Sequence, residues 1–280
     1  MHIAIIGVGL MGGSLAMSLK DNQFSTKIVG VDASASNCKK ALELGLVDEI
    51  STFEKAIEEA QLIVLATPVD TIPTLAVKVL NKISSNQIVM DIGSVKEELA
   101  EMICQHPKRG RFVATHPMWG TEKSGPEWSV KGAFKGRTVV ICDPNSSDKE
   151  ALDTVERLYT AIGMPVSYMT SEEQDLHSAY ISHISHVSAY ALALTVLEKE
   201  REEDRIFELA SAGFESTVRL AKSSSSMWVP IFLQNKYNLL DVLREHIHQL
   251  QIFRKMLEND DREGLTAVID KANTIKRIIP

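Results

Sequence analysis

Short hydrophobic runs alternate with helix-like segments over about the first 165 residues of the chain. The runs are rich in Ile and Val, and we expect them to form strands at residues 2–6, 27–31, 62–66, 87–92, 111–115 and 137–142. The segments between and after them have helical spacing at residues 34–45, 53–59, 70–82, 95–104 and 148–162. Nearly continuous hydrophobic runs are typical of strands that are buried on both faces. The alternation therefore predicts a parallel sheet with crossover helices.

The pattern changes from Thr170 onward, where hydrophobic residues recur every three or four positions. Ser171 and Gln174 are spaced as a capping box and predict the start of a long helix. One face of this helix should carry Leu176, Tyr180, His183, Val187, Tyr190 and Leu194. Further helices are expected near 203–211, 227–258 and 261–278. The fold class is thus α/β, with a doubly wound, Rossmann-like domain at 1–168 and an all-helical domain at 169–280. So long an apolar stripe favours a homodimer formed through the helical domain.

The composition narrows the classes of function. The 280 residues are 44% hydrophobic and 24% charged, and the formal net charge is −7, which argues against a nucleic-acid partner. No apolar run approaches the ~20 residues of a membrane span, and the N-terminus has no basic leader. The three cysteines are far apart and predict no metal or redox site. We therefore expect a cytoplasmic protein that has no membrane partner.

The first predicted strand leads into a glycine-rich turn, in the segment IAIIGVGLMGGSLA. Gly7 suits the tight turn, Gly9 lets a pyrophosphate approach the backbone, and Gly12 lets the following helix pack closely. A glycine triplet alone is weak evidence, but this one lies between a strand and a helix, as a dinucleotide site requires. Asp32 ends the second strand and can bind the ribose hydroxyls. No arginine follows it directly, which favours NAD over NADP as the cofactor.

A histidine, His116, follows the apolar run 111–115 and precedes Pro117. This end of a strand is where ligands of open α/β sheets bind. Oxidation of an alcohol carbon needs a group that accommodates the hydroxyl proton, and a neutral histidine can do so. Taken alone, a histidine in such a position is more often structural than catalytic.

Several motifs together resemble those of the prephenate/arogenate dehydrogenase family. They occur in the family's order and spacing: GVGLMGGSLA, DIGSVK (91–96), THPMWGTEKSG (115–125), ISHISH (181–186), AGFESTVRLAKSSSSMW (212–228) and NK (235–236). The resemblance extends nearly from end to end of the chain. It implies NAD-dependent oxidative decarboxylation of prephenate to 4-hydroxyphenylpyruvate, a step of tyrosine biosynthesis, in which the enzyme positions the substrate and manages a proton.

The resemblance also implies roles for individual residues. His116 matches the catalytic histidine that accepts a hydrogen bond from the C4 hydroxyl, and Ser94 matches the serine that links this hydroxyl, the histidine and the nicotinamide. Ser94 can also be a helix N-cap. Arg219 matches the arginine that holds the substrate carboxylate, although spacing alone favours an ion pair with Glu215, four residues earlier.

The remaining site residues divide between the two pockets. The substrate pocket is expected to contain His186, Glu122 and Trp228. The cofactor pocket is expected to contain, besides Gly7, Gly9, Gly12 and Asp32, the residues Leu10, Met11, Thr67 and Pro68. His183 and His186 lie three positions apart and share a helix face, but no third ligand is spaced for a metal, so we expect none.

Substrate choice and regulation are read from two further features. Arogenate carries an ammonium group, and relatives that prefer it have an aspartate where this chain has Ser216, so prephenate is the expected substrate. We expect this chain to carry neither a chorismate mutase domain nor a regulatory domain. Tyrosine, if it inhibits, is therefore expected to compete in the active site.

Three other functions remain open. The enzyme can be an arogenate or dual-substrate cyclohexadienyl dehydrogenase. It can be a β-hydroxyacid dehydrogenase of the same architecture, although those enzymes usually have a helix lysine as acid/base and lack HPMWG. A non-catalytic NAD-binding sensor is the third reading, and the combination of Ser94, His116 and Arg219 argues against it.

Overall fold

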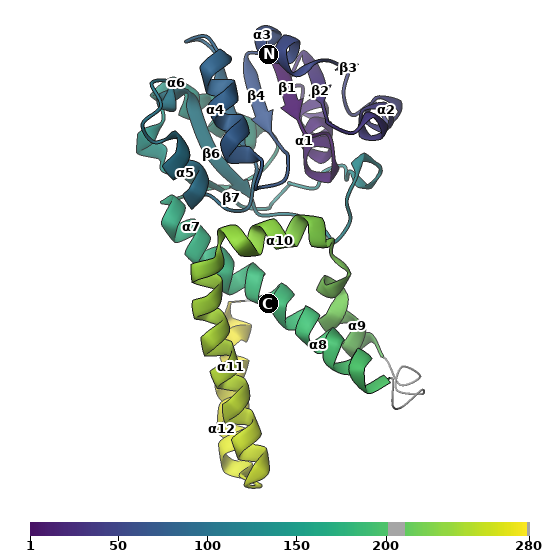
Figure 1. The fold of residues 1–280 in the computed structure, drawn as a ribbon, viewed down its shortest axis with the longest axis vertical. Coiled ribbons are helices and arrows are strands. Elements are labelled where there is room, and N and C mark those ends of the chain that lie inside the picture. Colours follow the sequence, from purple (N-terminus) through teal and green to yellow (C-terminus); the bar gives the residue numbers. More distant parts are fainter. Residues whose placement is uncertain (201–210, 279–280) are drawn as a thin grey trace. The chain divides into compact units, whose positions relative to one another are not determined.

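The fold was analysed in a computed structural model, which describes residues 1–200 and 211–278. These residues contain one eight-stranded sheet with helices around it, followed by a helical region (Figure 1). The strands are β1 (His2–Ile6), β2 (Lys27–Val31), β3 (Glu49–Ile50), β4 (Leu62–Leu65), β5 (Ile88–Asp91), β6 (Phe112–Pro117), β7 (Val139–Cys142) and β8 (Val166–Met169). The helices of the sheet region are α1 (Leu10–Asp21), α2 (Ala35–Glu43), α3 (Phe53–Glu59), α4 (Ile72–Lys82), α5 (Glu97–Ile103) and α6 (Lys149–Ala161).

The strand order is β3-β2-β1-β4-β5-β6-β7-β8. Its first six strands follow the order of the dinucleotide-binding doubly wound fold, with the direction of winding changing between β1 and β4. The predicted Rossmann-like α/β fold is therefore confirmed. Ligands of such sheets bind beside the carboxyl ends of the strands at this switch point.

Alternate residues of each strand enter two separate hydrophobic cores. Ile3 and Ile5 of β1 pack with residues of α1, α2 and α6 on one face. Ala4 and Ile6 pack with residues of α3, α4 and α5 on the other face. Burial on both faces explains why the strands read as continuous apolar runs instead of alternating ones.

The sheet departs from the sequence prediction in two ways. It is not wholly parallel, because β7 runs antiparallel to β6 and pairs in parallel with β8. The sequence pattern also missed two strands. β3 has only two residues, and β8 is an edge strand of mixed polarity whose Tyr168 is exposed. Neither forms the apolar run by which the other strands were found.

A long helical run begins with α7 (Ser171–Ser178), continues through the π-helical turn η4 (Ala179–His183) and ends with α8 (Ile184–Glu200). The predicted capping box is wrong by one residue: Thr170 and Glu173 form it. Ser171 instead contacts Asp143 through both its backbone N–H and its hydroxyl, and Gln174 turns inward.

Of the six residues expected on one face of this run, only His183 is buried within the chain, and Leu176, Tyr180 and Leu194 are exposed. The π-helical turn adds a residue and rotates the following helix relative to a regular 3.6-residue pattern. The buried positions are instead largely polar or small, and they are Ser171, Gln174, Asp175, Ser178, Ala179, His183, His186 and Ala189.

The later helices are α9 (Ala212–Val218), the short 3-10 turn η6 (Arg219–Lys222), α10 (Ser225–Gln234), α11 (Lys236–Glu258), α12 (Arg262–Asn273) and the turn η7 (Thr274–Arg277). The single helix predicted at 227–258 is two helices separated by Asn235, and the helix predicted near 203–211 falls almost entirely outside the described residues. By internal contacts the chain divides into a unit of residues 1–235 and a unit of residues 236–280. All candidate site residues lie in the first unit.

The helical run Ser171–Glu200 meets the length and composition of a helix that can cross a membrane, although the sequence has no unbroken apolar run of that size. Only 17% of its most apolar window is buried within the chain. A single such helix is weak evidence for a membrane, because apolar helices that pack against protein pass the same test. Its exposed apolar side chains do need another surface to cover them.

Candidate functional site

The glycine loop has the geometry that each predicted role requires. Gly7 has φ +100°, and a Cβ there would lie 2.5 Å from the backbone oxygen of Ala66, at the end of β4. A Cβ on Gly12 would lie 2.0 Å from the oxygen of Gly7, so this glycine allows α1 to approach the loop. A Cβ on Gly9 would meet no atom of the described residues within 4 Å. The loop is therefore closed on the protein side at Gly7 and Gly12 and open at Gly9, as pyrophosphate binding demands.

The other predicted cofactor residues surround this loop. Asp32 follows β2, and its carboxylate accepts hydrogen bonds from the backbone N–H groups of Val8 (3.0 Å) and Ser34 (2.8 Å). Leu10 and Met11 form the first turn of α1, whose N-terminus no described side chain caps. Such a helix end attracts the negative charge of a phosphate. The residues present thus fit a dinucleotide.

Thr67 and Pro68 come directly after Ala66, which contacts Gly7, and they form a turn at the carboxyl end of β4. The Thr71 hydroxyl lies 2.7 Å from both the Thr67 hydroxyl and the Pro68 carbonyl oxygen. The turn therefore has a fixed shape beside the loop. Thr67 and Pro68 stand at the switch point between β1 and β4, on the same side as Gly9.

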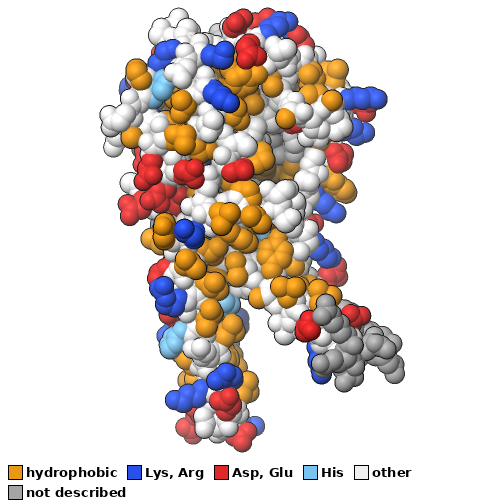
Figure 2. Space-filling view, in the orientation of Figure 1, with side chains coloured by type: hydrophobic (Ala, Val, Ile, Leu, Met, Phe, Trp, Pro, Cys, Tyr) orange, Lys and Arg blue, Asp and Glu red, His pale blue; other side chains and the backbone are white. Residues whose placement is uncertain are grey.

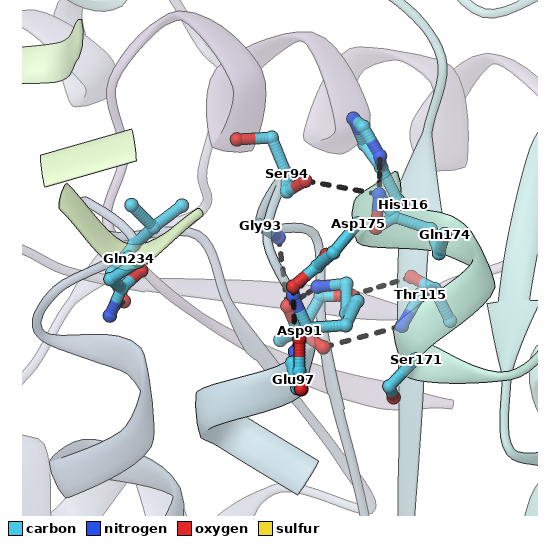
Figure 3. Close-up of polar contacts among 12 residues, drawn as sticks. Asp91, Gly93, Ser94, Glu97, Thr115, His116, Ser171, Gln174, Asp175 and Gln234 are labelled. Carbon is cyan, nitrogen blue, oxygen red and sulfur yellow. Dashed lines mark hydrogen bonds and ion pairs between the residues drawn. The ribbon is translucent and has the colours of Figure 1, made fainter. Parts of the chain in front are cut away.

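His116 is the penultimate residue of β6, and Ser94 follows the end of β5 (Figure 3). A third side chain, Gln174 of α7, joins them: its Nε2 lies 3.1 Å from the Ser94 carbonyl oxygen and 3.1 Å from Nδ1 of His116. The same nitrogen lies 2.7 Å from the Ser178 hydroxyl. The two predicted catalytic residues are therefore neighbours, and Gln174 is a site residue that the sequence pattern had assigned to a helix cap.

A buried ion pair lies behind the site. Lys96 and Asp91 are both fully buried and contact each other directly. The Asp91 carboxylate also accepts hydrogen bonds from the backbone N–H groups of Gly93 (2.8 Å) and Thr115 (3.2 Å), and so connects the ends of β5 and β6. Burial raises the pKa of Asp91, while Lys96 opposes the rise. A charged residue inside the apolar run QIVMDI was the available sequence signal for this pair.

This surrounding keeps the ring of His116 neutral. Burial lowers the pKa of His116 to about 3, and the positive charge of Lys96 and the neighbouring His183 add to the effect. A neutral imidazole keeps a lone pair on one nitrogen, which a general base requires.

Ser94 is not the N-cap of α5, contrary to one sequence reading. That helix begins at Glu97, and the carboxylate of Asp175 caps it by accepting from the backbone N–H groups of Lys96 (2.8 Å) and Glu97 (2.9 Å). Burial raises the pKa of Asp175 to about 6, although both N–H groups oppose the rise. The side chain of Ser94 is therefore not used as a cap.

The helical part of the unit adds an aromatic cluster. His186 stacks on Trp228 with 3.4 Å between ring centroids, and His183 packs edge-on against the same indole at 5.9 Å. Nδ1 of His183 accepts a hydrogen bond of 3.1 Å from Nδ2 of Asn235, which also donates to the backbone oxygen of Asp175. Burial lowers the pKa of both histidines, to about 4 for His183. Both are neutral packed side chains, and residues 1–200 and 211–278 contain no group of three or more His, Cys, Asp or Glu arranged for a metal.

Arg219 contacts Glu122, with 3.4 Å between Nη1 and Oε2, and its charge lowers the pKa of His186. The ion pair with Glu215 that spacing favours is not formed, because Glu215 pairs with Lys222. Arg219, Glu122, His186 and Trp228 thus belong to one region. Ser216 is exposed on α9, and no polar contact joins it to Arg219 in the described part of the chain.

A doubly wound sheet with an open glycine loop and a neutral histidine at the carboxyl edge defines the class of NAD-dependent oxidoreductases. The family model for the prephenate dehydrogenase nucleotide-binding domain matches residues 15–168, and the model for the prephenate dehydrogenase dimerization domain matches residues 170–271. The chain therefore belongs to the prephenate/arogenate dehydrogenase family, and its cofactor is NAD.

Individual relatives agree on the family and differ in substrate. The chain is 30% identical to prephenate dehydrogenase of Bacillus subtilis, over 99% of this chain and 76% of the relative, and 29% identical to cyclohexadienyl dehydrogenase of Zymomonas mobilis, over 94% and 91%. The structure of Aquifex aeolicus prephenate dehydrogenase with hydroxyphenyl propionate and NAD+ has a TM-score of 0.90 at 32% identity and covers 100% of this chain and 98% of its own. Synechocystis arogenate dehydrogenase has a TM-score of 0.79 at 25% identity and full coverage of both chains.

Proposed function

We propose that this protein catalyses the NAD-dependent oxidative decarboxylation of prephenate to 4-hydroxyphenylpyruvate, in tyrosine biosynthesis. The observation that carries the proposal is that a neutral His116 and Ser94 both contact the Gln174 amide, at the edge of the sheet that also holds the glycine loop. A sensor that only binds NAD has no use for a neutral base at this place.

The proposed reaction balances without a further reactant. The C4–H bond breaks with its electron pair leaving as hydride, for which bound NAD supplies the acceptor. The bond to the ring carboxylate then breaks, carbon dioxide leaves, and its electron pair completes the aromatic ring. The C4 oxygen becomes positively polarised as the hydride leaves, so a lone pair of His116 at its proton lowers the barrier. The product phenol retains a proton on this oxygen.

Arg219 and Glu122 have the proposed task of binding the substrate side chain. The Arg219 side chain is more than half exposed, and the one ion pair it makes with the described residues is the 3.4 Å contact to Glu122, so a ligand carboxylate can compete for it. His186 and Trp228 offer a flat neutral surface beside it. Glu122, His186 and Trp228 are therefore proposed as pocket residues, and Leu10, Met11, Thr67, Pro68 and Asp32 as NAD-binding residues alongside the glycines.

Prephenate is proposed over arogenate because Ser216 leaves the exposed side of α9 without the aspartate that would attract an ammonium group. The alternative is arogenate or dual specificity, since the relatives include arogenate and cyclohexadienyl dehydrogenases. Ser216→Asp is expected to raise the kcat/KM ratio of arogenate to prephenate about tenfold, the effect of one additional charge contact. An unchanged ratio, measured with both substrates, would exclude Ser216 as the determinant.

The wider setting is part of the same proposal. We place the enzyme in the cytoplasm as a homodimer, with residues 1–168 binding NAD and residues 169–280 binding substrate and forming the dimer. The dimerization-domain match over residues 170–271 supports this arrangement. Tyrosine is proposed to inhibit by competition with prephenate, and an unchanged KM with a lowered kcat in its presence would contradict this.

The deciding experiment is NADH formation at 340 nm with NAD and either prephenate or arogenate, for the wild-type protein and His116→Asn. Turnover of prephenate that the substitution lowers by at least about 100-fold supports the proposal. Turnover of arogenate alone overturns the substrate, and NAD binding without turnover of either overturns the enzyme.

A further inference from the structure

Gln174 is held at the centre of the site with no freedom to face solvent. The residue is 2% exposed, and its Nε2 lies within hydrogen-bond distance of the Ser94 carbonyl, the Ser178 hydroxyl and Nδ1 of His116 (Figure 3). Its Oε1 is buried and has no hydrogen-bond partner in the described part of the chain. Nε2 has three close partners while the buried Oε1 has none, and a buried polar atom without a partner costs free energy. The orientation of this amide therefore has to be explained by its neighbours.

The Ser94 carbonyl identifies which end of the amide faces the histidine. A carbonyl oxygen only accepts hydrogen bonds, so the Gln174 atom beside it must be the nitrogen. An amide nitrogen has no lone pair to offer, so a protonated Nδ1 of His116 would face it donor to donor, and Nδ1 is therefore the unprotonated ring nitrogen. The proton of the neutral ring is then on Nε2. An imidazolium would direct its Nδ1–H against the amide N–H of Gln174.

We propose that Gln174 is the positioning residue of His116, and that the orientation of its amide decides which ring nitrogen carries the proton. In the orientation seen here His116 presents an Nε2–H donor at its other edge. Rotating the amide by half a turn would place Oε1 against Nδ1, which would then carry the proton and leave the Nε2 lone pair free. This rotation gives Oε1 partners in His116 and Ser178, but it sets Oε1 against the Ser94 carbonyl oxygen and moves the amide nitrogen to the place where Oε1 now has no partner. The free enzyme therefore favours the orientation seen here.

The consequence for catalysis rests on the proposed function, in which His116 accepts the hydroxyl proton. A base that uses Nε2 needs the rotated amide, so substrate binding should favour that orientation. Ser94 links the two events, because its carbonyl holds the amide in one orientation and its side chain is the second proposed catalytic group. Gln174 thus acts through His116 and needs no contact with substrate.

The other charged and titratable groups near the ring do not fix its proton. Lys96, on the segment before α5, and His183, on η4, both disfavour the charged ring whichever nitrogen is protonated. Asp91 is engaged by Lys96, and Asp175 is engaged by the N-terminus of α5. Among the hydrogen-bond partners of His116 given by the structure, Gln174 is the one that distinguishes the two nitrogens.

Two variants separate the amide's role from a merely structural one. Gln174→Glu keeps the shape but offers only acceptors when ionised, so Nδ1 becomes the protonated nitrogen and the negative charge favours the imidazolium. Gln174→Met keeps the approximate volume and offers neither donor nor strong acceptor.

The first readout is the nitrogen-15 spectrum of histidine-labelled protein without substrate, with the His116 signals assigned by their loss in His116→Asn. Wild type is expected to show an Nε2-protonated neutral ring, and Gln174→Glu an Nδ1-protonated ring whose pKa is raised by at least one unit. An Nδ1–H ring in the folded wild-type protein, or identical tautomer and pKa in wild type and Gln174→Glu, overturns the proposal.

The second readout is the pH profile of kcat/KM for whichever substrate is turned over. Gln174→Glu is expected to move the acidic limb of the profile upward by at least one pH unit, and Gln174→Met to lower kcat at least tenfold with KM nearly unchanged. If the variants only raise KM, and the acidic limb of the pH profile does not move in Gln174→Glu, Gln174 does not position His116. Because the spectra need no turnover, failure of the proposed reaction and failure of the Gln174 assignment are distinguished.

Discussion

At the scale of single residues, the site depends on a buried ion pair. Lys96 and Asp91 have no exposed surface, and their charges are compensated by each other and by backbone N–H groups from β6 and the β5–α5 segment. A buried pair of this kind adds little net stability compared with apolar residues, but it becomes costly once one partner is removed. Its position behind His116 makes it part of the site's electrostatics.

Lys96→Met is therefore expected to lower the free energy of unfolding by about 3–5 kcal/mol, because it leaves the Asp91 carboxylate buried without its cation. Urea denaturation followed by circular dichroism measures this. The matched control is the double variant Lys96→Met with Asp91→Asn, which removes both charges and should recover at least half of the loss. Equal losses in the single and double variants would contradict the assignment of the cost to an unpaired charge.

Two histidines with lowered pKa values predict how stability depends on pH. Their pKa values in the folded protein are about 3 for His116 and about 4 for His183, below the ordinary value near 6.5. The unfolded chain therefore binds protons that the folded chain does not, and stability falls as the pH falls below 6.5 toward these values. Asp175, with its pKa raised to about 6, takes up its proton in the folded state first and offsets part of the loss.

Between pH 7 and pH 5, His116 alone accounts for a loss of about 2 kcal/mol. His116→Asn should remove this contribution, so the difference in unfolding free energy between the two pH values should shrink by that amount. Urea titrations of both proteins at pH 7 and pH 5 provide the comparison. If the two proteins lose stability equally, His116 is not held neutral by the fold.

At the scale of elements, the glycine loop and α1 contain one glycine expected to matter for NAD binding and another expected to matter for folding. Gly9 is the N-cap of α1 with an extended backbone that alanine also adopts, and a Cβ there meets no described atom within 4 Å. Gly9→Ala should therefore fold normally but bind NAD at least about tenfold more weakly, because the methyl group occupies the space expected for the pyrophosphate.

Gly12→Ala is the matched variant three residues away. Its Cβ would lie 2.0 Å from the Gly7 oxygen, so it should destabilise the fold by about 1–3 kcal/mol through overpacking. Calorimetric NAD titration and thermal denaturation of both variants test the contrast. Normal NAD affinity in Gly9→Ala would show that the pyrophosphate does not approach the loop there.

The elements also show what the sequence was able to predict. All six continuous apolar runs became strands, because burial on both faces leaves a strong pattern in the sequence. The helix start at Thr170 was displaced by one residue because two overlapping cap patterns compete there, and the contact of Ser171 with Asp143, 28 residues away, decides between them.

Some residues of the candidate site could be predicted from the sequence, and others could not. His116, Ser94 and the glycine loop belong to local motifs, which one sequence can reveal. Gln174 contacts His116 across 58 positions, and Asp175 contacts Lys96 across 79 positions. Such contacts depend on the packing of α7 against the sheet, and no local spacing reports them.

At the scale of the whole molecule, the helical part of the first unit leaves large apolar side chains uncovered. Ile181 of η4 is 64% exposed and Leu233 of α10 is 65% exposed, and hydrophobic side chains gather over α10 in Figure 2. Soluble monomers rarely present contiguous apolar patches of large side chains. Residues 170–271 match a dimerization domain, so we expect a second copy of the chain to cover these side chains.

We therefore expect wild type to sediment as a dimer and Leu233→Glu to shift it toward monomer at micromolar concentration, because an interface that buries an unpaired carboxylate loses several kcal/mol. Leu42→Glu is the matched control, since Leu42 is 48% exposed on α2 in the sheet region and should leave the dimer intact. Sedimentation velocity over a dilution series measures both. A dimer that survives Leu233→Glu would move the interface away from α10, and a monomeric wild type would leave the membrane-like composition of Ser171–Glu200 without a protein partner to explain it.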